Sequence, residues 1–503
     1  MRAEKEGLTP SERYLGRLCR RSFLSPWSYQ NLHTDEGRKS ASVPGHELCD
    51  LLVVFGDTVI IFSDKHVAFH EKKPIEVAWP RWFRKAVRKS VRQLHGAESW
   101  VRNHPDRIFL DPLCVNPFPI PLPSSNKIDI HLVAVATGAY EACYKYFGRQ
   151  SIGSLMLATD LYDTHHEKVP FTVGWVDSKR KFVHVFDEFS LDAVFGEIDT
   201  ISDFVAYLEK RESFLTKRTP IIRAPGEEQL LAIYLTKMNE CGEHDFVIPN
   251  AGGENPDLIS FDESFWQGMV NDQQYKRKKL ADRISYAWDR LIEHFVALGG
   301  AYDRNFQRSE SVADIEIGLR HMAAESRLSR RQLASAFVDL LKTTPSDKRK
   351  ARVVYSNEFP TNAYVFLVLP KIDGESYDIY RQNRVALLSA YCQVAKLRCE
   401  KAQYIIGIAT ESYRAEGASE DLVVLDVRDW NDELNDEAKR LQSEGGLLLA
   451  GNVRTQEGRT LEYPAESGDS TASSFSKRQK DPRKLRKKRN MIQKNSRKKN
   501  RRK

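Results

Sequence analysis

An acid and a lysine lie at matching distances from a two-residue turn in the most apolar part of the sequence. The runs CDLLVVF and TVIIFSDK are separated only by Gly56-Asp57, and a glycine in the first position of a two-residue connection suits a tight hairpin. Counting outward from that turn places Asp50 opposite Ser63. Residues opposite one another share a face, with Cβ atoms about 5 Å apart, and so do residues two apart on a strand. The pattern therefore predicts that Asp50, Ser63 and Lys65 converge on one surface.

An acid and a lysine in this arrangement are suited to the hydrolysis of phosphodiesters. Carboxylates hold a Mg²⁺ ion, which polarises a phosphate and lowers the pKa of bound water. A lysine beside them stabilises or orients the charge that develops on the phosphate. Asp50 and Lys65 are the candidates for these two tasks. A plain buried hairpin with a solvated acid and lysine at its ends is the alternative interpretation.

The run ELCDLLVVFGDTVIIFSDK resembles the D…(D/E)-x-K core of the PD-(D/E)XK nuclease superfamily, which has the restriction-endonuclease-like fold, and in particular its Mrr-like and nuclease-related (NERD-like) branches. Gln93, in VRQLHGAESWV, stands where RecB-like members often place a glutamine. The resemblance covers roughly residues 20–110, and the whole region to 215 if the fold extends that far. It implies cleavage of nucleic acid, most often DNA, with Mg²⁺ or Mn²⁺, and Gln93 would orient water or backbone.

The sequence departs from that family pattern at one position of the core. Ser63 stands where the family has Asp or Glu, and a hydroxyl is a much poorer Mg²⁺ ligand than a carboxylate. Asp64 is adjacent, but in a regular strand it points to the opposite face. A bulge at Ser63-Asp64 could turn Asp64 inward, Glu47 could supply the second carboxylate, or the site could be inactive. We favour a metal-ligand set of Asp50 with Asp64 or Glu47.

A basic stripe follows on the next predicted helix. The segment RWFRKAVRKSVRQLHGAESWV, residues 81–101, has one apolar face made by Trp82, Ala86, Val87, Ser90, Val91 and Leu94. Basic residues recur beside that face at three- and four-residue spacing, namely Arg81, Arg84, Lys85, Arg88, Lys89 and Arg92. Such a stripe can contact successive phosphates. A solvated helix surface is the alternative interpretation.

The charge of the chain is divided unevenly between its body and its C-terminal end. The formal net charge is +8, and residues 477–503 hold 16 Lys and Arg against the single acid Asp481. That tail alone carries +15, so residues 1–476 carry −7. A tail of this charge attracts nucleic acid with a strong dependence on salt, although a solubilising or targeting role is nearly as well supported.

Composition excludes several classes of protein. No apolar run reaches the roughly 20 residues of a membrane helix, and the first residues are charged rather than apolar as in a secretory signal. Seven cysteines without a Cys-x-x-Cys pair fit a reduced compartment. The motifs of P-loop ATPases, zinc proteases and serine hydrolases are absent from the sequence. We therefore expect a cytoplasmic protein with no membrane partner, and homo-oligomerisation stays open.

The pattern of apolar residues predicts an α/β protein in four parts. They are an N-terminal restriction-endonuclease-like domain with a mixed sheet, a mostly helical region, a second α/β domain and a disordered basic tail, at residues 1–215, 216–345, 346–465 and 466–503. The clearest predicted strands and helices lie at 129–137, 152–158, 171–177, 181–186, 201–214, 273–298, 363–370, 377–398, 404–410 and 422–427.

The leading hypothesis is a Mg²⁺-dependent nuclease that hydrolyses DNA, with RNA not excluded as a substrate. Family analogy alone suggests a role in defence against foreign DNA. Two alternatives stand beside it. One is a catalytically inactive nuclease-fold protein that binds nucleic acid, with Ser63 as the sign of a lost metal centre. The other is a protein-interaction scaffold whose tail aids solubility.

Overall fold

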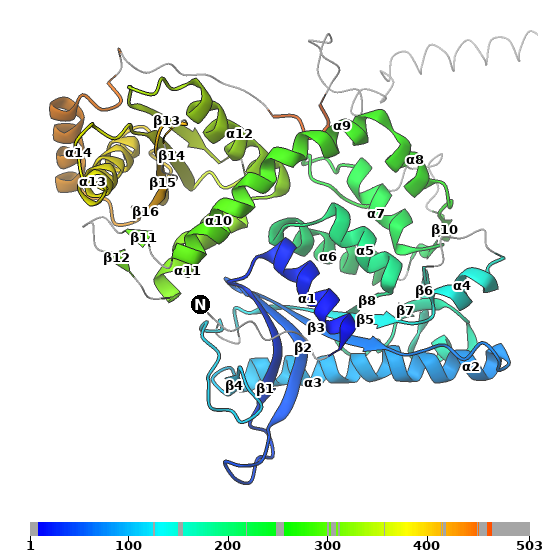
Figure 1. The fold of residues 1–503 in the computed structure, drawn as a ribbon. Helices are drawn as coiled ribbons and strands as arrows, with labels where there is room; N and C mark the ends of the chain where they lie inside the picture. The colour runs from blue at the N-terminus through cyan, green and yellow to red at the C-terminus, as the bar shows by residue number, and fades with distance from the viewer. Residues whose placement is uncertain are drawn as a thin grey trace, which may run out of the picture.

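Three β-sheets with helices packed on their faces make up the described part of the chain (Figure 1). The structure is a computed structural model, and it describes residues 9–123, 126–148, 154–217, 219–247, 256–298, 301–302, 308–309, 312–356, 358–413, 415, 419–449, 451 and 460–464. The predicted α/β class is confirmed. The basic tail lies outside the described residues. None of the helices in the described part of the chain combines the length and the apolar character needed to span a bilayer.

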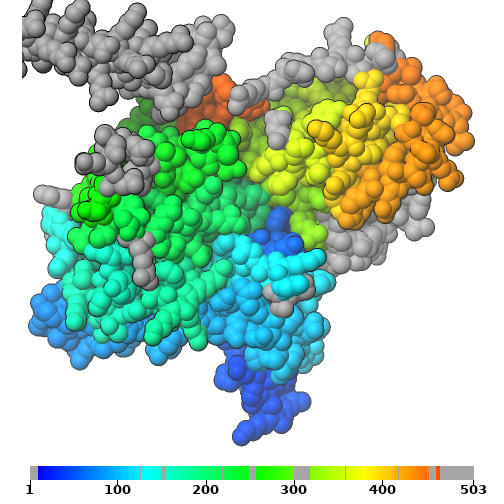
Figure 2. Space-filling model, turned by 180° about the vertical axis from the view of Figure 1, so that it is seen from behind, coloured from blue at the N-terminus to red at the C-terminus, as the bar shows by residue number. Residues whose placement is uncertain are grey.

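The first sheet carries the hairpin identified in the sequence. Its strand order is β4-β1-β2-β3-β5-β8, where these strands are β1 (Ser28–Thr34), β2 (His46–Phe55), β3 (Thr58–His66), β4 (Ile108–Phe109), β5 (Asp129–Thr137) and β8 (Val183–Phe186). Strands β1, β2 and β3 are antiparallel, whereas β5 and β8 run parallel to β3. The sheet is therefore mixed, as predicted. The connection between β1 and β2 projects from the body, as the dark blue lobe of Figure 2 shows.

The β2–β3 turn has the geometry that its glycine predicts. Gly56 has a φ of 59° while Asp57 keeps a negative φ, which is the type II′ pattern that favours glycine first and matches the twist of paired strands. Pairing runs from Phe55 opposite Thr58 to Leu51 opposite Phe62. The register deduced from the sequence is thus confirmed for these five pairs.

One long helical segment covers one face of this sheet (Figure 1). It consists of α2 (Ile75–Phe83), a π-helical turn (Arg84–Arg88) and α3 (Lys89–Asn103). The predicted apolar face is confirmed, because all six of its side chains, from Trp82 to Leu94, are buried. The helix begins six residues before the predicted start and continues through Pro80.

The opposite face is covered by α1 (Pro10–Phe23), α5 (Glu188–Glu197) and α6 (Ile201–Leu215). Helix α1 begins with a capping box, in which the Glu12 amide donates to Thr9 Oγ1 and the Thr9 amide donates to Glu12 Oε2, each at 3.2 Å. Four phenylalanines from α1, β3, α5 and the start of α6 pack together, with ring centroids 5.1 to 6.5 Å apart. This aromatic core fixes α1 against β3.

A second, smaller sheet is built from strands on both sides of residue 215. Its order is β10-β9-β6-β7, with β6 (Met156–Tyr162), β7 (Thr172–Trp175), β9 (Ile221–Ala224) and β10 (Leu258–Ser260). Helix α4 (Tyr140–Tyr146) and a 3₁₀ turn (Asp163–Lys168) lie near it. Because β9 pairs with β6, the strand pairing crosses the position at which the sequence suggested a boundary.

The following region is mostly helical, as expected, and leads into a third sheet. The helices are α7 (Glu227–Thr236), α8 (Phe265–Asn271), α9 (Gln273–Asp282), a 3₁₀ turn (Arg283–Ser285), α10 (Tyr286–Leu298), α11 (Val312–Ala324) and α12 (Arg327–Thr343). The sheet has the order β12-β11-β16-β15-β14-β13, with β11 (Ala301–Tyr302), β12 (Arg308–Ser309), β13 (Lys350–Tyr355), β14 (Asn362–Val368), β15 (Tyr404–Thr410) and β16 (Glu420–Asp426). Helices α13 (Tyr377–Lys396) and α14 (Asp432–Gly445) complete this α/β unit.

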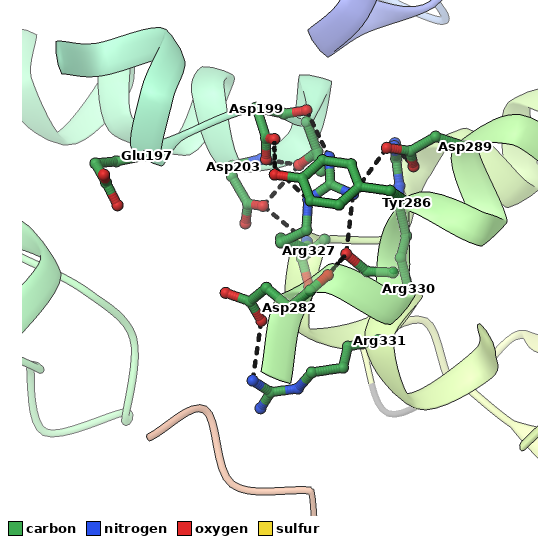
Figure 3. A network of polar contacts seen from close by, with 12 residues as sticks. Glu197, Asp199, Asp203, Asp282, Tyr286, Asp289, Arg327, Arg330 and Arg331 are labelled. Atoms are coloured by element: carbon green, nitrogen blue, oxygen red, sulfur yellow. Dashed lines mark hydrogen bonds and ion pairs between the residues drawn. The ribbon is translucent and has the colours of Figure 1, made fainter. Parts of the chain in front are cut away.

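A buried ionic network joins the N-terminal region to the helices that precede the third sheet (Figure 3). Arg327, at the start of α12, donates to Asp199 Oδ1 and Asp289 Oδ2, both at 2.8 Å. Arg330 donates to Asp289 Oδ1 at 2.7 Å. All four side chains are at least nine-tenths buried. Because buried charges are tolerated only with such partners, the network ties α10 and α12 to the turn between α5 and α6.

Candidate functional site

In the first sheet, β2 and β3 separate at Asp50. Past Leu51 and Phe62 the two strands of the hairpin no longer pair with each other. The beginning of β2 stays paired with β1, and the end of β3 stays paired with β5. The Asp50 carboxylate lies in this fork, where its Oδ2 accepts a hydrogen bond of 2.6 Å from the Asp64 amide. A side chain thus replaces the backbone acceptor that continued pairing would have supplied.

The predicted acid and lysine meet in this fork. Lys65 Nζ lies 3.4 Å from Asp50 Oδ2, so the two side chains are on the same side of the sheet. Asp50 is 3% exposed, whereas the Lys65 side chain keeps 25% of its surface in solvent. The ammonium group can therefore reach both the carboxylate and a ligand that arrives from solvent.

Asp64 is the least satisfied group of the site. Its carboxylate is buried, with 5% exposure, and neither oxygen has a hydrogen bond of normal geometry among the described residues. Burial, aided by the charges of Asp50 and Glu12, raises the pKa of Asp64 to about 6, against the opposing effects of the nearby Ser11 hydroxyl and of Lys65. A buried carboxylate without a well-placed donor is costly, and a bound cation would relieve that cost.

No bulge is needed to bring Asp64 to the site. Strand β3 pairs with β5 in unbroken register from Thr58 to His66, so the bulge at Ser63-Asp64, one of the three possibilities left open by the sequence, does not occur. The charges of Asp50 and Lys65 nevertheless influence the pKa of Asp64, and so does that of Glu12, which α1 brings over β3.

Two further carboxylates border the fork. Glu47 is the second residue of β2, next to the projecting loop, and its side chain is exposed. Partial burial nevertheless raises its pKa; the charge of Asp50 adds to this rise and that of Lys65 opposes it. Glu12 influences both Glu47 and Asp64. Glu12 was not identified from the sequence as a residue of this site. Its place beside the fork depends on how α1 docks on β3, and the capping box of which it is part carries no signal of that.

Ser63 has a different partner from the one expected. The hydroxyl of Ser63 donates to Gln93 Oε1 on α3 at 3.2 Å. This hydrogen bond links Gln93 to the end of β3. The predicted Asp50–Ser63 pair does not form, because β2 leaves β3 one residue earlier. Ser63 and Lys65 still share a face, because β3 is regular through both residues.

The donor set of the fork suits a hard cation. Asp50, Asp64, Glu47 and Glu12 offer carboxylate oxygens, and the two oxygens of Asp64 lack partners among the described residues. No three of these acids place ligand atoms within 4.8 Å of one another; among the described residues such groups occur elsewhere. Mg²⁺ is commonly held by one or two carboxylates and several waters. The residues present therefore fit Mg²⁺ or Mn²⁺ bound through two of them.

The basic stripe on the long helical segment is divided in two. Arg84 and Arg88 pair with Glu167, at 3.4 and 2.9 Å, and are committed to the 3₁₀ turn that follows β6. The other four, at spacings of four, four and three residues, are exposed and form no ion pair with the described residues; they are Arg81, Lys85, Lys89 and Arg92. This exposed subset follows one side of the helix toward Gln93.

Comparison of the chain with protein-family models, with curated proteins and with solved structures finds no match in any of the three.

Proposed function

We propose that this protein is a Mg²⁺-dependent nuclease whose active site is the fork between β2 and β3. The observation that carries the proposal is the Asp50–Lys65 contact of 3.4 Å beside the unpartnered carboxylate of Asp64. An acid, a lysine and a second acid with a pKa near neutrality form the minimum set for metal-assisted hydrolysis of a phosphodiester. The resemblance of the same residues to the D…(D/E)-x-K core supports this assignment.

Each residue of the fork has a task in this proposal. Asp50 would hold the ion, with Asp64 or Glu47 as the second carboxylate, and the bound ion would polarise the phosphate. Lys65 would stabilise the negative charge on the phosphate. Asp64, with its pKa raised to about 6, could accept a proton from the attacking water at neutral pH. Gln93, held by Ser63, would orient water or the nucleic-acid backbone.

The proposed substrate class rests on the exposed basic side chains of the long helical segment. Arg81, Lys85, Lys89 and Arg92 present cations along one helix side, as contact with successive phosphates requires. We propose DNA as the substrate, and we treat RNA as the comparison substrate. A non-catalytic nucleic-acid-binding protein is the second candidate, favoured by the serine at position 63.

The test is cleavage of supercoiled plasmid and of labelled single-stranded RNA by the full-length protein with Mg²⁺, with Mn²⁺ and with EDTA. We expect metal-dependent nicking of the plasmid that is lost in Asp50→Asn and in Lys65→Ala. The matched control is Asp57→Asn, an exposed acid at the turn of the same hairpin, which should cleave normally.

Each outcome decides between the candidates. Binding of DNA without cleavage under every metal condition would favour the non-catalytic protein. Cleavage that persists in Asp50→Asn would show that the fork is not the active site. Absence of both binding and cleavage would leave the scaffold hypothesis.

A further inference from the structure

A second group of metal-ligand side chains lies at the other end of the first sheet. Asp129 and His131 are on β5, His184 is on the neighbouring β8, and Glu209 and Glu212 are one helical turn apart on α6. Asp129 pairs with Thr58 in the parallel ladder, whereas Lys65 pairs with Ala136. Seven residues at about 3.3 Å each separate the two ends, so this group, hereafter the β5–α6 cluster, is distinct from the fork.

The ligand atoms of the β5–α6 cluster are already close together. Those of Asp129, His131 and Glu209 all lie within 4.8 Å of one another, and so do those of His131, His184 and Glu212. His131 belongs to both groups. An imidazole nitrogen with several carboxylate oxygens is a donor set that Zn²⁺ and related divalent transition ions accept.

His131 is a buried side chain that lacks hydrogen-bond partners. It is 2% exposed, and neither ring nitrogen forms a hydrogen bond within the described part of the chain. Its Nε2 lies 3.2 Å from Asp129 Oδ2 without the geometry of a hydrogen bond. Buried polar atoms are normally satisfied. An ion bound at the ring would satisfy this histidine and explain why it faces the carboxylates of α6.

His184 is less suited to ligate the ion. Arg211 donates from its Nη1 to His184 Nδ1 at 3.1 Å. A neutral imidazole has a single lone pair on its ring nitrogens, so this contact uses it and leaves a proton on Nε2. That nitrogen is 3.9 Å from Glu212 Oε2. His184 therefore directs an N–H toward Glu212, and the ligand set reduces to His131 and the carboxylates.

The arginines near the β5–α6 cluster pair with acids outside it, so its carboxylates can accept a cation. Arg211 is held by Glu227 through two contacts of 2.7 Å, and Arg102 lies 3.2 Å from Glu98. Lys181 approaches Asp129 only to 3.8 Å. The side chains of Asp129 and Glu212 keep 47% and 29% of their surface exposed, so an ion can reach the cluster from solvent.

We propose that Asp129, His131 and Glu209 bind a divalent transition ion of the Zn²⁺ class, with Glu212 available as a fourth ligand. The ion joins the beginning of β5 to α6, and it is independent of the ion that the nuclease activity requires. Its donor set includes nitrogen, whereas the fork offers only oxygen.

The test is calorimetric titration of the metal-free, full-length protein with Zn²⁺ in millimolar Mg²⁺, which occupies oxygen-only sites. We expect one Zn²⁺ per chain to bind in this buffer. Affinity should fall at least tenfold in His131→Gln and in Glu209→Gln. The matched control, His165→Gln, replaces an exposed histidine outside the cluster and should bind like the wild type. Equal affinity in the wild type and both cluster variants, or binding lost only in His165→Gln, would overturn the proposal.

A second measurement guards against misfolding of His131→Gln, whose side chain is buried. Glu209 is exposed, so Glu209→Gln should keep the metal-free unfolding temperature of the wild type. Zn²⁺ should raise that temperature in the wild type through preferential binding to the folded state and raise it much less in Glu209→Gln. An equal rise in both proteins would contradict the assignment. Plasmid cleavage in Mg²⁺ alone should be the same in both, which separates this site from the proposed function.

Discussion

The Lys65 ammonium and the Asp50 carboxylate lie 3.4 Å apart at the point where β2 and β3 separate. Under the proposed function these two groups act on one phosphate, the first directly and the second through the ion. We expect Lys65→Ala to lower the cleavage rate by about 100-fold or more, because a charge-stabilising donor in a partly buried site has that effect. Single-turnover cleavage with saturating protein measures it.

A change in substrate binding must be distinguished from this fall in the cleavage rate. The affinity of Lys65→Ala for DNA in the presence of Ca²⁺ should stay within a few-fold of the wild type, since one of several cations is removed. A loss of affinity as large as the loss of rate would assign Lys65 to binding instead.

Asp64 should give the protein a characteristic dependence on pH. Its pKa is raised to about 6, against an unfolded value near 3.9, so the folded state binds more protons between those two values. Its contribution to stability is therefore fully present below pH 4 and is lost as the pH rises through 6. Asp64→Asn should be more stable than the wild type by roughly 2–3 kcal/mol at pH 7.5 and nearly equal to it at pH 4. Urea unfolding at both values tests this difference.

The same substitution should reduce activity. If ionised Asp64 holds the ion or accepts a proton, the wild-type rate should rise with pH through about 6, and Asp64→Asn should be slow at every pH. A variant that is more stable but fully active would remove Asp64 from the mechanism.

Ser63→Ala tests whether the serine marks a lost metal centre. Ser63 Oγ donates to Gln93 Oε1 at 3.2 Å and forms no hydrogen bond with Asp50 or Lys65 in the described part of the chain. We expect a loss of stability of about 1 kcal/mol and a change in cleavage rate below tenfold. Abolished cleavage would mean that the hydroxyl takes part directly.

The exposed part of the basic stripe should determine affinity and its salt dependence. Changing Arg81, Lys85, Lys89 and Arg92 together to Gln should weaken DNA binding and reduce the salt slope by up to about 3 to 4, at roughly 0.9 per phosphate contact. Arg84→Gln is the comparison, because that side chain pairs with Glu167 and should alter the slope little. Fluorescence anisotropy across a salt series measures both.

The buried ionic network should contribute strongly to stability. Arg330 is fully buried, pairs with Asp289, and also donates to the carbonyls of Glu325 and Ala323. Removing one member of such a network leaves unpaired buried groups, so Arg330→Met should lower the free energy of unfolding by about 3–5 kcal/mol. The exposed pair Arg428–Asp426 is the control, and Arg428→Met should leave the unfolding midpoint in place. Equal effects would contradict this account.

The hairpin and its two chemical groups could be predicted from the sequence because their information is local. A two-residue turn with a leading glycine fixes the register, and the register places Asp50 and Lys65 on one side. The long helix was predictable for the same reason, since its apolar residues recur at helical spacing.

The features that could not be predicted from the sequence depend on tertiary packing or have a weak local pattern. Glu12 reaches the fork only because the aromatic core docks α1 on β3. Strand β1 was missed because its segment, SYQNLHT, is polar, although four of its seven side chains are buried. Helix α14 was missed because its apolar residues, although at helical spacing, are few in a strongly charged segment, and Ala438 is the single buried residue.

The pairing of β6 with β9 limits how this protein can be divided for experiments. A recombinant fragment that stops at residue 215 would leave the edge of β6 without its neighbour and open the apolar surface that α7 covers. Unprotected strand edges recruit other chains, so aggregation of such a fragment would say nothing about catalysis. Deletion studies of the N-terminal region therefore need to retain β9, α7 and β10.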